Sequence, residues 1–153
     1  SLNTGVPMTH VAYRGSVPGV TDVIGGQIAA MFTPHGDFLA NHRAGKLRML
    51  ATSGKTRSAF APEVPTFAEQ GFAELTVEEW FGFFAPAKTP AQVLSAANAS
   101  INQTLKDKTV VESLALQGLV PVGGSIDDMA KDMRRQFDDW GPIVKRIGFT
   151  ADS

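Results

Sequence analysis

The sequence predicts an α/β fold, in which a parallel βαβ region is followed by a mainly helical region. In the first half, short β-branched or apolar runs alternate with short helical segments. In the second half, apolar residues recur every three or four positions over longer stretches, as they do in amphipathic helices. Strands that alternate with helices form parallel sheets through right-handed crossovers.

Three strands and two short helices are predicted before the first long loop. The predicted strands cover residues 9–13, 27–32 and 46–52. Ser16 is the predicted N-cap of the first helix, which the pair Gly25 and Gly26 ends. Asp37 is the predicted cap of the second helix, which ends near Gly45.

The middle of the chain contains a loop, a short helix and a long strand. The loop at 53–65 is rich in Ser, Pro and charged residues. Thr66 and Glu69 then have the spacing of a capping box, which begins the short helix. The aromatic run 76–85 is a predicted strand that is long enough to connect two lobes. We therefore expect the chain to pass from one lobe to the other within residues 76–88.

Two long helices and a short strand at 119–122 are predicted in the second half. Thr89 is the predicted N-cap of the first helix, with Pro90 at its first position. Ser125 is the predicted cap of the second helix, and Asp128 has capping-box spacing from it. The apolar stripe of the second helix consists of Met129, Met133, Phe137, Trp140, Val144 and Ile147. We interpret this stripe as core, but without a covering sheet it would be exposed and able to pair with another chain.

The composition excludes several classes of protein. The 153 residues include Lys+Arg 14 and Asp+Glu 15, and the formal net charge of -1 argues against a general nucleic-acid binder. No apolar run approaches the roughly 18–20 residues of a membrane-spanning helix. Because Cys is 0, disulfides, thiolate catalysis and cysteine zinc sites are excluded. The histidines lack the spacing of a helical zinc motif, so we expect neither a metal nor a cofactor.

Two predicted turns combine residue types that bind small anions. Ligands of open α/β sheets lie at the carboxyl ends of the strands, where helix N-termini present unpaired N–H groups. In this chain these ends are the turns 13–16 and 33–37. The aromatic ring, cation, glycine and hydroxyl of the first turn suit a carboxylate. The alternative is that Arg14 is a solvated surface charge and that Ser16 is only a helix cap.

An α/β enzyme, such as a hydrolase that uses Ser16 or His35, is a second hypothesis. The nucleophile motif GxSxG is absent, because Pro18 occupies the position of its last glycine. Ser16, His35 and Asp37 supply the residue types of a hydrolytic triad, but their spacing does not support one. Product formation would separate an enzyme from a binding protein, which is only stabilised by its ligand.

Several segments of the chain, in their order, resemble one known family. They are HVAYRGSVPGVTDVIGGQI, AGKLRMLATSGKTRSAFAPEVPTFAEQGF, EWFGFFAPAKTPAQVLSAANASINQTL, and a tail with GLVPVGGSIDDM and DDWGPIVKRIGF. The chain is similar to the periplasmic substrate-binding receptors of tripartite tricarboxylate transporters, the Bug-type family. The resemblance covers nearly the whole sequence.

The resemblance implies a periplasmic-binding-protein-like fold whose two lobes close on a small carboxylated solute. Such a receptor is periplasmic and performs no chemistry on its ligand. It delivers the ligand to the permease subunits of a membrane transporter. It also implies that this chain is a fragment, the C-terminal portion of a longer protein. Residues 1–80 would be part of the second lobe, and residues 81–153 would be the crossing strand and the helices that return to the first. A third hypothesis is that the fragment self-associates without a complete binding site.

The resemblance also assigns ligand contacts to residues that match the family. The turn that keeps the family pattern consists of Tyr13, Arg14, Gly15 and Ser16. Thr33 stands where the family often has an aspartate that can pair with an amine. We therefore expect an organic or aromatic acid as the ligand rather than an amino acid. Thr33, Pro34 and His35 are expected to shape specificity, and Trp80 is expected to provide an apolar wall.

Overall fold

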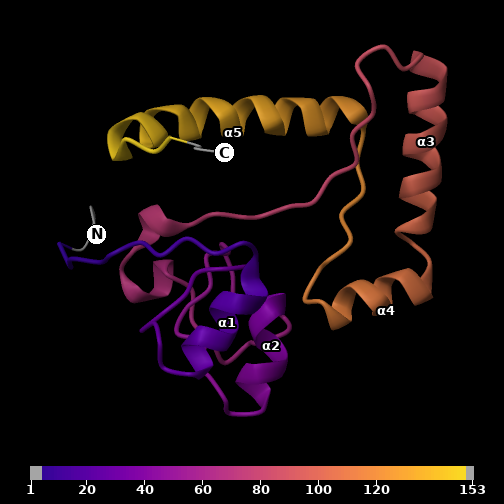
Figure 1. The fold of residues 1–153 in the computed structure, drawn as a ribbon. Coiled ribbons are helices and arrows are strands. Elements are labelled where there is room, and N and C mark those ends of the chain that lie inside the picture. Colours follow the sequence, from indigo (N-terminus) through magenta and orange to yellow (C-terminus); the bar gives the residue numbers. More distant parts are fainter. Residues whose placement is uncertain (1–4, 151–153) are drawn as a thin grey trace. The chain divides into compact units, whose positions relative to one another are not determined.

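Helices provide the regular secondary structure of residues 5–150, the part of the chain that this computed structural model describes (Figure 1). They are α1 (Ser16–Ile24), α2 (Gly36–Arg43), η1 (Ala68–Gln70), η2 (Ala73–Leu75), α3 (Ala91–Thr104), α4 (Lys108–Leu116) and α5 (Ile126–Ile147). The elements η1 and η2 are short 3₁₀ turns. The mainly helical character predicted for the second half is therefore confirmed.

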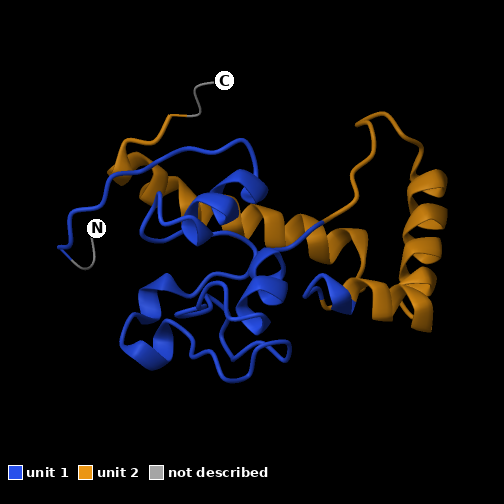
Figure 2. Ribbon diagram, turned by 60° about the horizontal axis from the view of Figure 1, so that its bottom comes forward, with its two compact units in different colours: residues 1–81, 115–119 blue, residues 82–114, 120–153 orange. Residues whose placement is uncertain are grey.

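The chain divides into two compact units, which Figure 2 colours separately. The first unit contains the chain up to Phe81 together with the segment Ala115–Leu119. The second unit contains Gly82–Leu114 and the chain from Val120 onward. The polypeptide therefore passes between the units three times, and the segment Ala115–Leu119 packs with residues far from it in sequence.

The predicted strands are not formed within residues 5–150. Regular strand structure is missing from the runs 9–13, 27–32, 46–52, 76–85 and 119–122. One parallel bridge joins Thr52 to Thr66. In this bridge the Thr52 N–H donates to the Pro65 carbonyl (3.0 Å), and the Phe67 N–H donates to the Thr52 carbonyl (2.9 Å). A strand is stable only when a neighbour pairs with its backbone groups, and the periodicity of the sequence does not supply that neighbour.

The first two helices begin one or two residues away from their predicted caps. The N-cap of α1 is Gly15, whose φ of 93° places it in a region that favours glycine, so Ser16 is the first helical residue instead of the cap. The N-cap of α2 is His35, and Asp37 lies inside the first turn. The Asp37 carboxylate accepts a hydrogen bond from the Thr33 hydroxyl (3.1 Å) and therefore ties this turn together.

The capping box predicted at Thr66 and Glu69 is confirmed. The Thr66 N–H donates to Glu69 Oε2 (2.7 Å), and the Glu69 N–H donates to Thr66 Oγ1 (3.1 Å). Arg57 Nε donates to both oxygens of the same carboxylate (2.9 and 3.0 Å), and Arg57 also donates to the Pro62 carbonyl (3.1 Å). The Thr66 N–H and the Arg57 guanidinium lower the pKa of Glu69. One carboxylate thus connects the 53–65 loop to η1.

A small apolar core in the first unit holds α2 against the chain that follows it. The buried members of this core are Leu39, Met49, Ala61 and Val64, with Phe38, Leu47 and Phe60 packed against them. Leu39 is the contribution of α2 and is only 3% exposed. The core is small for a unit of this length, so the polar contacts of the loops carry a large share of the local order.

Two glycines allow the segment Ala115–Leu119 to approach the start of α2. A Cβ at Gly36 would collide with the Gln117 carbonyl. A Cβ at Gly118 would lie 2.8 Å from His35 Nε2 and 3.0 Å from Leu39 Cδ1, and Gly118 also has a φ of +71°. Both the space and the backbone conformation therefore require glycine at position 118.

In the second unit, side-chain amides of α3 bind the backbone just before α5. Asn102 Oδ1 accepts from the Gly124 N–H (2.9 Å), and Asn102 Nδ2 donates to the Gly124 carbonyl (2.9 Å). Asn98 Nδ2 donates to the same carbonyl (3.1 Å).

The prediction for the start of α3 is wrong. Its N-cap is Pro90 instead of Thr89, and no side chain caps the helix. The Thr89 N–H donates to the Pro86 carbonyl.

The predicted ends of α5 are confirmed, but the side chains of its apolar stripe are not buried in a core. Ser125 and Asp128 form both hydrogen bonds of a capping box, and Gly148 ends the helix in a left-handed conformation. In the described chain, Phe137 is 72% exposed and Trp140 is 42% exposed. This matches the alternative in which the stripe lacks a covering sheet, since an amphipathic helix is buried only when another element covers its apolar face.

Replacing Gly118 with alanine is expected to lower the free energy of unfolding by about 1–3 kcal/mol, because the new Cβ is both strained and crowded by His35 and Leu39. Urea unfolding followed by circular dichroism would measure this loss. Gly141→Ala is the matched control, since nothing lies within 4 Å of a Cβ there. It should instead stabilise α5 by about 0.5–1 kcal/mol. Equal stabilities of Gly118→Ala and the parent would contradict the packing described here.

Glu69 is expected to make the stability of the first unit dependent on pH. Its lowered pKa means that its contribution is present above the ordinary glutamate pKa of about 4.3 and is lost as the pH falls through the lowered value. Glu69→Gln should therefore be less stable than the parent at pH 7, and the difference should shrink in acid. Urea unfolding across the acid range tests this, with Glu74→Gln on η2 as the exposed control. A constant difference at all pH values would rule out the ionised carboxylate as the cause.

Candidate functional site

The turn that contains Tyr13 and Arg14 is fixed to α1 by a side-chain hydrogen bond. The Tyr13 hydroxyl donates to Asp22 Oδ2 (2.7 Å), and Asp22 lies on α1. The Tyr13 ring also lies against α1, with Cδ2 3.3 Å from where a Cβ at Gly19 would be. This hydrogen bond to the Asp22 carboxylate raises the pKa of Tyr13. Tyr13 is therefore a residue that positions the turn, because its hydroxyl is already engaged.

Arg14 and the start of α1 form the most anion-attracting feature of this turn. Arg14 is exposed, and within residues 5–150 no hydrogen bond or ion pair to its guanidinium is found. It is followed by Gly15 at the N-cap and by Ser16 as the first residue of α1. The first amides of a helix have no partner inside the helix, and the helix dipole favours negative charge there. A cation without a counter-ion beside such amides can bind a carboxylate.

The second predicted turn borders an open pocket. The pocket has a volume of about 280 Å³ and is lined by Pro34, Gly36, Asp37, Phe81, Leu116, Gln117 and Leu119. Its wall is about as polar as it is apolar, and Asp37 is the charged residue among those that line it. Neither Arg14 nor Ser16 lines this pocket, although α1 and α2 contact each other. The two predicted turns are therefore on neighbouring helices, but only the second borders this pocket.

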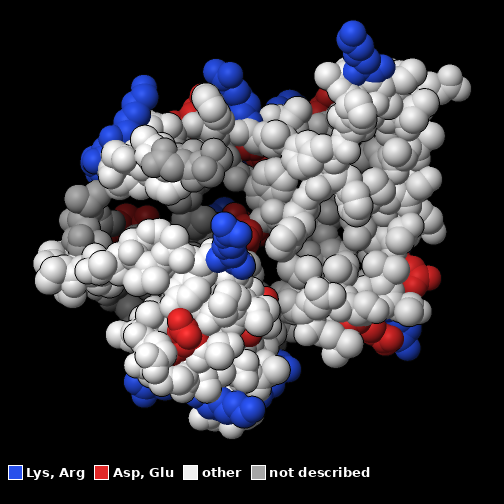
Figure 3. Space-filling model, in the orientation of Figure 1, with Lys and Arg blue, Asp and Glu red and all other residues white. Residues whose placement is uncertain are grey.

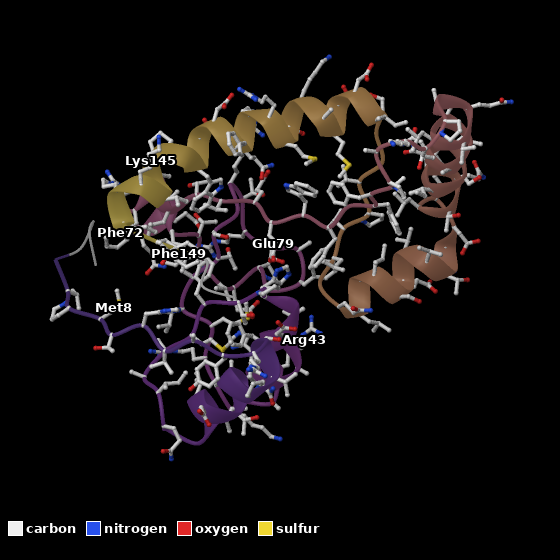
Figure 4. The ribbon with its side chains drawn as sticks, turned by 45° about the horizontal axis from the view of Figure 1, so that its top comes forward. Met8, Arg43, Phe72, Glu79, Lys145 and Phe149 are labelled. Carbon is white, nitrogen blue, oxygen red and sulfur yellow. The ribbon has the colours of Figure 1, made fainter. Side chains whose placement is uncertain are left out.

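His35 is held by a residue that the sequence did not single out. Its Nε2 lies 3.3 Å from Ser58 Oγ, and its ring stacks on Phe60 with centroids 6.0 Å apart. Burial lowers the pKa of His35, and the Glu79 carboxylate opposes that shift. Glu79 lies on the irregular segment that follows η2 (Figure 4). Ser58 is 23 positions from His35, so no local spacing in the sequence could have revealed the pair.

The remaining predicted contacts are placed less favourably for a ligand. Thr33 donates its hydroxyl proton to Asp37, so that proton is not available to a ligand in this arrangement. Trp80 is 41% exposed and does not line the pocket, whereas its neighbour Phe81 does. The sequence singled out Trp80 as an apolar wall, and the alternating direction of neighbouring side chains in an extended segment explains why Phe81 takes that place instead.

The hydrogen bonds do not assemble the hydrolytic set considered above. His35 pairs with Ser58, and Asp37 pairs with Thr33, so neither is joined to Ser16 by these bonds. Among the described residues, no group of three or more His, Cys, Asp or Glu side chains could hold a metal ion.

Charged side chains of both signs lie on the face of the molecule that Figure 3 shows, where Lys and Arg are interspersed with Asp and Glu. Within residues 5–150, no helix combines the length and the apolar character needed to cross a bilayer.

The single tyrosine offers a direct test of the turn. Ultraviolet titration of the phenol is expected to give a pKa above the ordinary value of about 10, because the protonated hydroxyl donates a hydrogen bond to the Asp22 carboxylate. The raised pKa means that this bond stabilises the fold below about pH 10 and is lost as the pH rises through the Tyr13 pKa. Asp22→Ala should return the titration to the ordinary value, while Asp127→Ala on α5 should leave it unchanged. An ordinary pKa in the folded parent would disprove the bond.

Known proteins are similar to this chain in sequence and in fold. Residues 1–149 match the family described as the tripartite tricarboxylate transporter family receptor. The protein BugT of Bordetella pertussis is 35% identical over 147 residues, which are 96% of this chain and 45% of that protein. A solved structure described as a periplasmic transporter has a TM-score of 0.89 at 36% identity, over 99% of this chain and 50% of the other. An R. palustris protein solved with adipate has a TM-score of 0.85 at 28% identity, over 95% and 48%.

These comparisons confirm the resemblance drawn from the sequence. The chain spans about half the length of each of these three proteins. The similarity in fold supports the periplasmic-binding-protein-like class, although the strands expected of that class are not formed within residues 5–150. From the match over nearly its whole length, the chain belongs to the tripartite tricarboxylate transporter receptor family.

Proposed function

We propose that this chain is part of a periplasmic receptor that captures a small carboxylate and delivers it to the permease subunits of a membrane transporter. The observation that carries the proposal is the exposed Arg14 guanidinium, which has no counter-ion among the described residues and adjoins the first amides of α1. The solved R. palustris relative with adipate supports a dicarboxylate as the first ligand to test. No chemistry on the ligand is part of this proposal.

The carboxylate would bind at the start of α1. Arg14 supplies a planar pair of N–H donors that matches two carboxylate oxygens, and the amides that follow Gly15 supply further donors. Tyr13 contributes indirectly, because its bond to Asp22 keeps the turn in place. Asp37 would repel an anion at the start of α2, which favours α1 as the place where the charge is held.

Specificity would come from the second turn. Thr33, Pro34 and His35 would contact the remainder of the ligand, with an apolar wall from Trp80 or the neighbouring Phe81. Asp37 is the acidic side chain of this turn, and the Thr33 hydroxyl already occupies one of its oxygens. The preference for an organic or aromatic acid over an amino acid is supported by Thr33, which stands in place of an aspartate that could pair with an amine, and not by Asp37, whose second oxygen could accept from an amine. Competition between adipate and amino acids would test that preference.

The division into lobes is also a proposal. Residues 1–80 would be part of the second ligand-binding lobe, and residues 81–153 would contain the crossing strand and the helices that return to the first lobe. The change of compact unit after Phe81 supports this boundary. BugT and the solved periplasmic transporter are about twice as long as this chain, which supports a site completed by additional polypeptide.

Arg14→Gln is expected to weaken adipate binding about 10- to 100-fold, because a charged pair of hydrogen bonds to the carboxylate is lost. Isothermal titration calorimetry would measure the change. The melting temperature should not move, since the Arg14 guanidinium is exposed and forms no hydrogen bond or ion pair with the described residues. Arg48→Gln is the matched control, because Arg48 is an exposed cation of the same unit. Unchanged adipate affinity in Arg14→Gln would refute the proposed site.

A further inference from the structure

Two histidines of the first unit are held by hydrogen bonds at their ring nitrogens, His35 at Nε2 and His42 at both Nδ1 and Nε2. His35 is half-buried at the N-cap of α2, and its Nε2 lies 3.3 Å from Ser58 Oγ. His42 lies in the last turn of the same helix, with its side chain 16% exposed. The two rings therefore differ in surroundings although they share one short helix, and their hydrogen bonds determine where each carries its proton.

The bonds of His42 require a proton on Nε2. The Met49 N–H donates to His42 Nδ1 (3.3 Å), so Nδ1 must be the acceptor nitrogen. His42 Nε2 lies 3.0 Å from Glu63 Oε1, and only a protonated Nε2 can donate to that carboxylate. The hydrogen bonds to Met49 and to Glu63 thus require the same form of the neutral His42 ring, the Nε2–H tautomer.

The bonds of Ser58 favour the opposite form at His35. The Phe60 N–H donates to Ser58 Oγ (3.2 Å), so this oxygen already accepts one hydrogen bond. The Ser58 hydroxyl proton then needs an acceptor, and in the described residues His35 Nε2 is the one found beside it. If His35 Nε2 carried a proton instead, Ser58 Oγ would accept two hydrogen bonds, one on each lone pair, and the Ser58 hydroxyl proton would have no partner among the described residues.

We infer that Ser58 is a positioning residue that holds His35 as the neutral Nδ1–H tautomer, whereas His42 is the Nε2–H tautomer. Phe60 fixes the plane of the His35 ring by stacking, and a Cβ at Gly118 would lie 2.8 Å from Nε2, so the ring keeps this position because residue 118 is glycine. His35 therefore presents an N–H donor to its turn, and it does not add a positive charge.

The groups around His35 keep the ring neutral near pH 7. The elements packed against it, Ser58–Phe60 and Ala115–Leu119, contain no titratable side chain. The charged groups near the ring are Glu79, on the segment after η2, and Asp37, on its own helix. Burial acts against the imidazolium and the Glu79 carboxylate acts in its favour, and burial is the larger effect.

The consequence for binding rests on the proposed function. If the turn at Thr33, Pro34 and His35 contacts the ligand, a fixed Nδ1–H tautomer presents the same donor at every pH at which the ring is neutral. Loss of the Ser58 hydroxyl would free the ring to change tautomer, which would make this contact less favourable. The loss in adipate affinity should be about two- to tenfold, the value of one hydrogen bond.

Long-range ¹H–¹⁵N correlation spectra of the ¹⁵N-labelled chain test the assignment without any ligand. In the parent, His35 should show a protonated Nδ1 and His42 a protonated Nε2, so that each ring is an internal reference for the other. In Ser58→Ala, His35 should shift to mainly the Nε2–H form while His42 stays unchanged. Ser58→Thr keeps the hydroxyl and should retain the parent pattern. A protonated Nε2 at His35 in the parent, or an unchanged Nδ1–H in folded Ser58→Ala, would overturn the inference.

Two further readouts keep the outcome decisive. If Ser58→Ala fails to fold, both rings lose their distinct signals, and the parent and Ser58→Thr spectra still decide the assignment. Adipate titrations of the same variants separate the inference from the proposed function. Correct tautomers with no effect of Arg14→Gln on adipate binding would refute the proposed site alone. A strong effect of Arg14→Gln together with Nε2–H at His35 would refute the tautomer assignment alone.

Discussion

An extended segment becomes a strand only when the backbone of a neighbouring segment forms hydrogen bonds with it, and the rest of this structure depends on that constraint. Residues 9–13 and 76–85 have the composition of strands, yet among the described residues no neighbouring strand pairs with them. The single parallel bridge between Thr52 and Thr66 shows what pairing requires, since it forms where η1 and its capping box hold the partner segment in place. The order of the first unit consequently comes from helices, a small core and side-chain bonds to the backbone.

The same dependence on local bonds explains how the candidate site is built. Tyr13 is bound to Asp22 and Thr33 is bound to Asp37, so each turn is tied to the helix that follows it. Arg14 is left without a partner among the described residues, which makes it the group in these turns that is best able to meet an anion. A ligand contact of this kind is compatible with a receptor, whose task is to hold and release a solute and which needs no reactive group.

Polar contacts between segments that are distant in sequence fix the loops of the first unit, whose apolar core is small. Arg57, Glu69 and Thr66 form one network, and His42 and Glu63 join the end of α2 to the loop after it. These groups are partly exposed, so each contact alone contributes little to stability. Their value lies in fixing the direction of the loops, on which the position of His35 and of the pocket beside it depends.

The sequence by itself determined the features that involve residues a few positions apart. The capping boxes at Thr66 and Ser125, the left-handed Gly148 and the helical second half follow from local hydrogen bonding and periodicity, which are legible in the order of residues. The family could also be identified from the sequence, because the segments typical of the family occur together and in order.

Only the tertiary structure decided the pairing of His35 with Ser58, the approach of Gly118 to α2, and the place of Phe81 at the pocket where Trp80 was expected. It also decided that the predicted strands do not form in residues 5–150 beyond the bridge at Thr52, and that the α5 stripe is exposed. Each of these depends on what lies opposite a residue in space. The spacing of residues along a chain fixes which way a side chain points but does not fix what it meets.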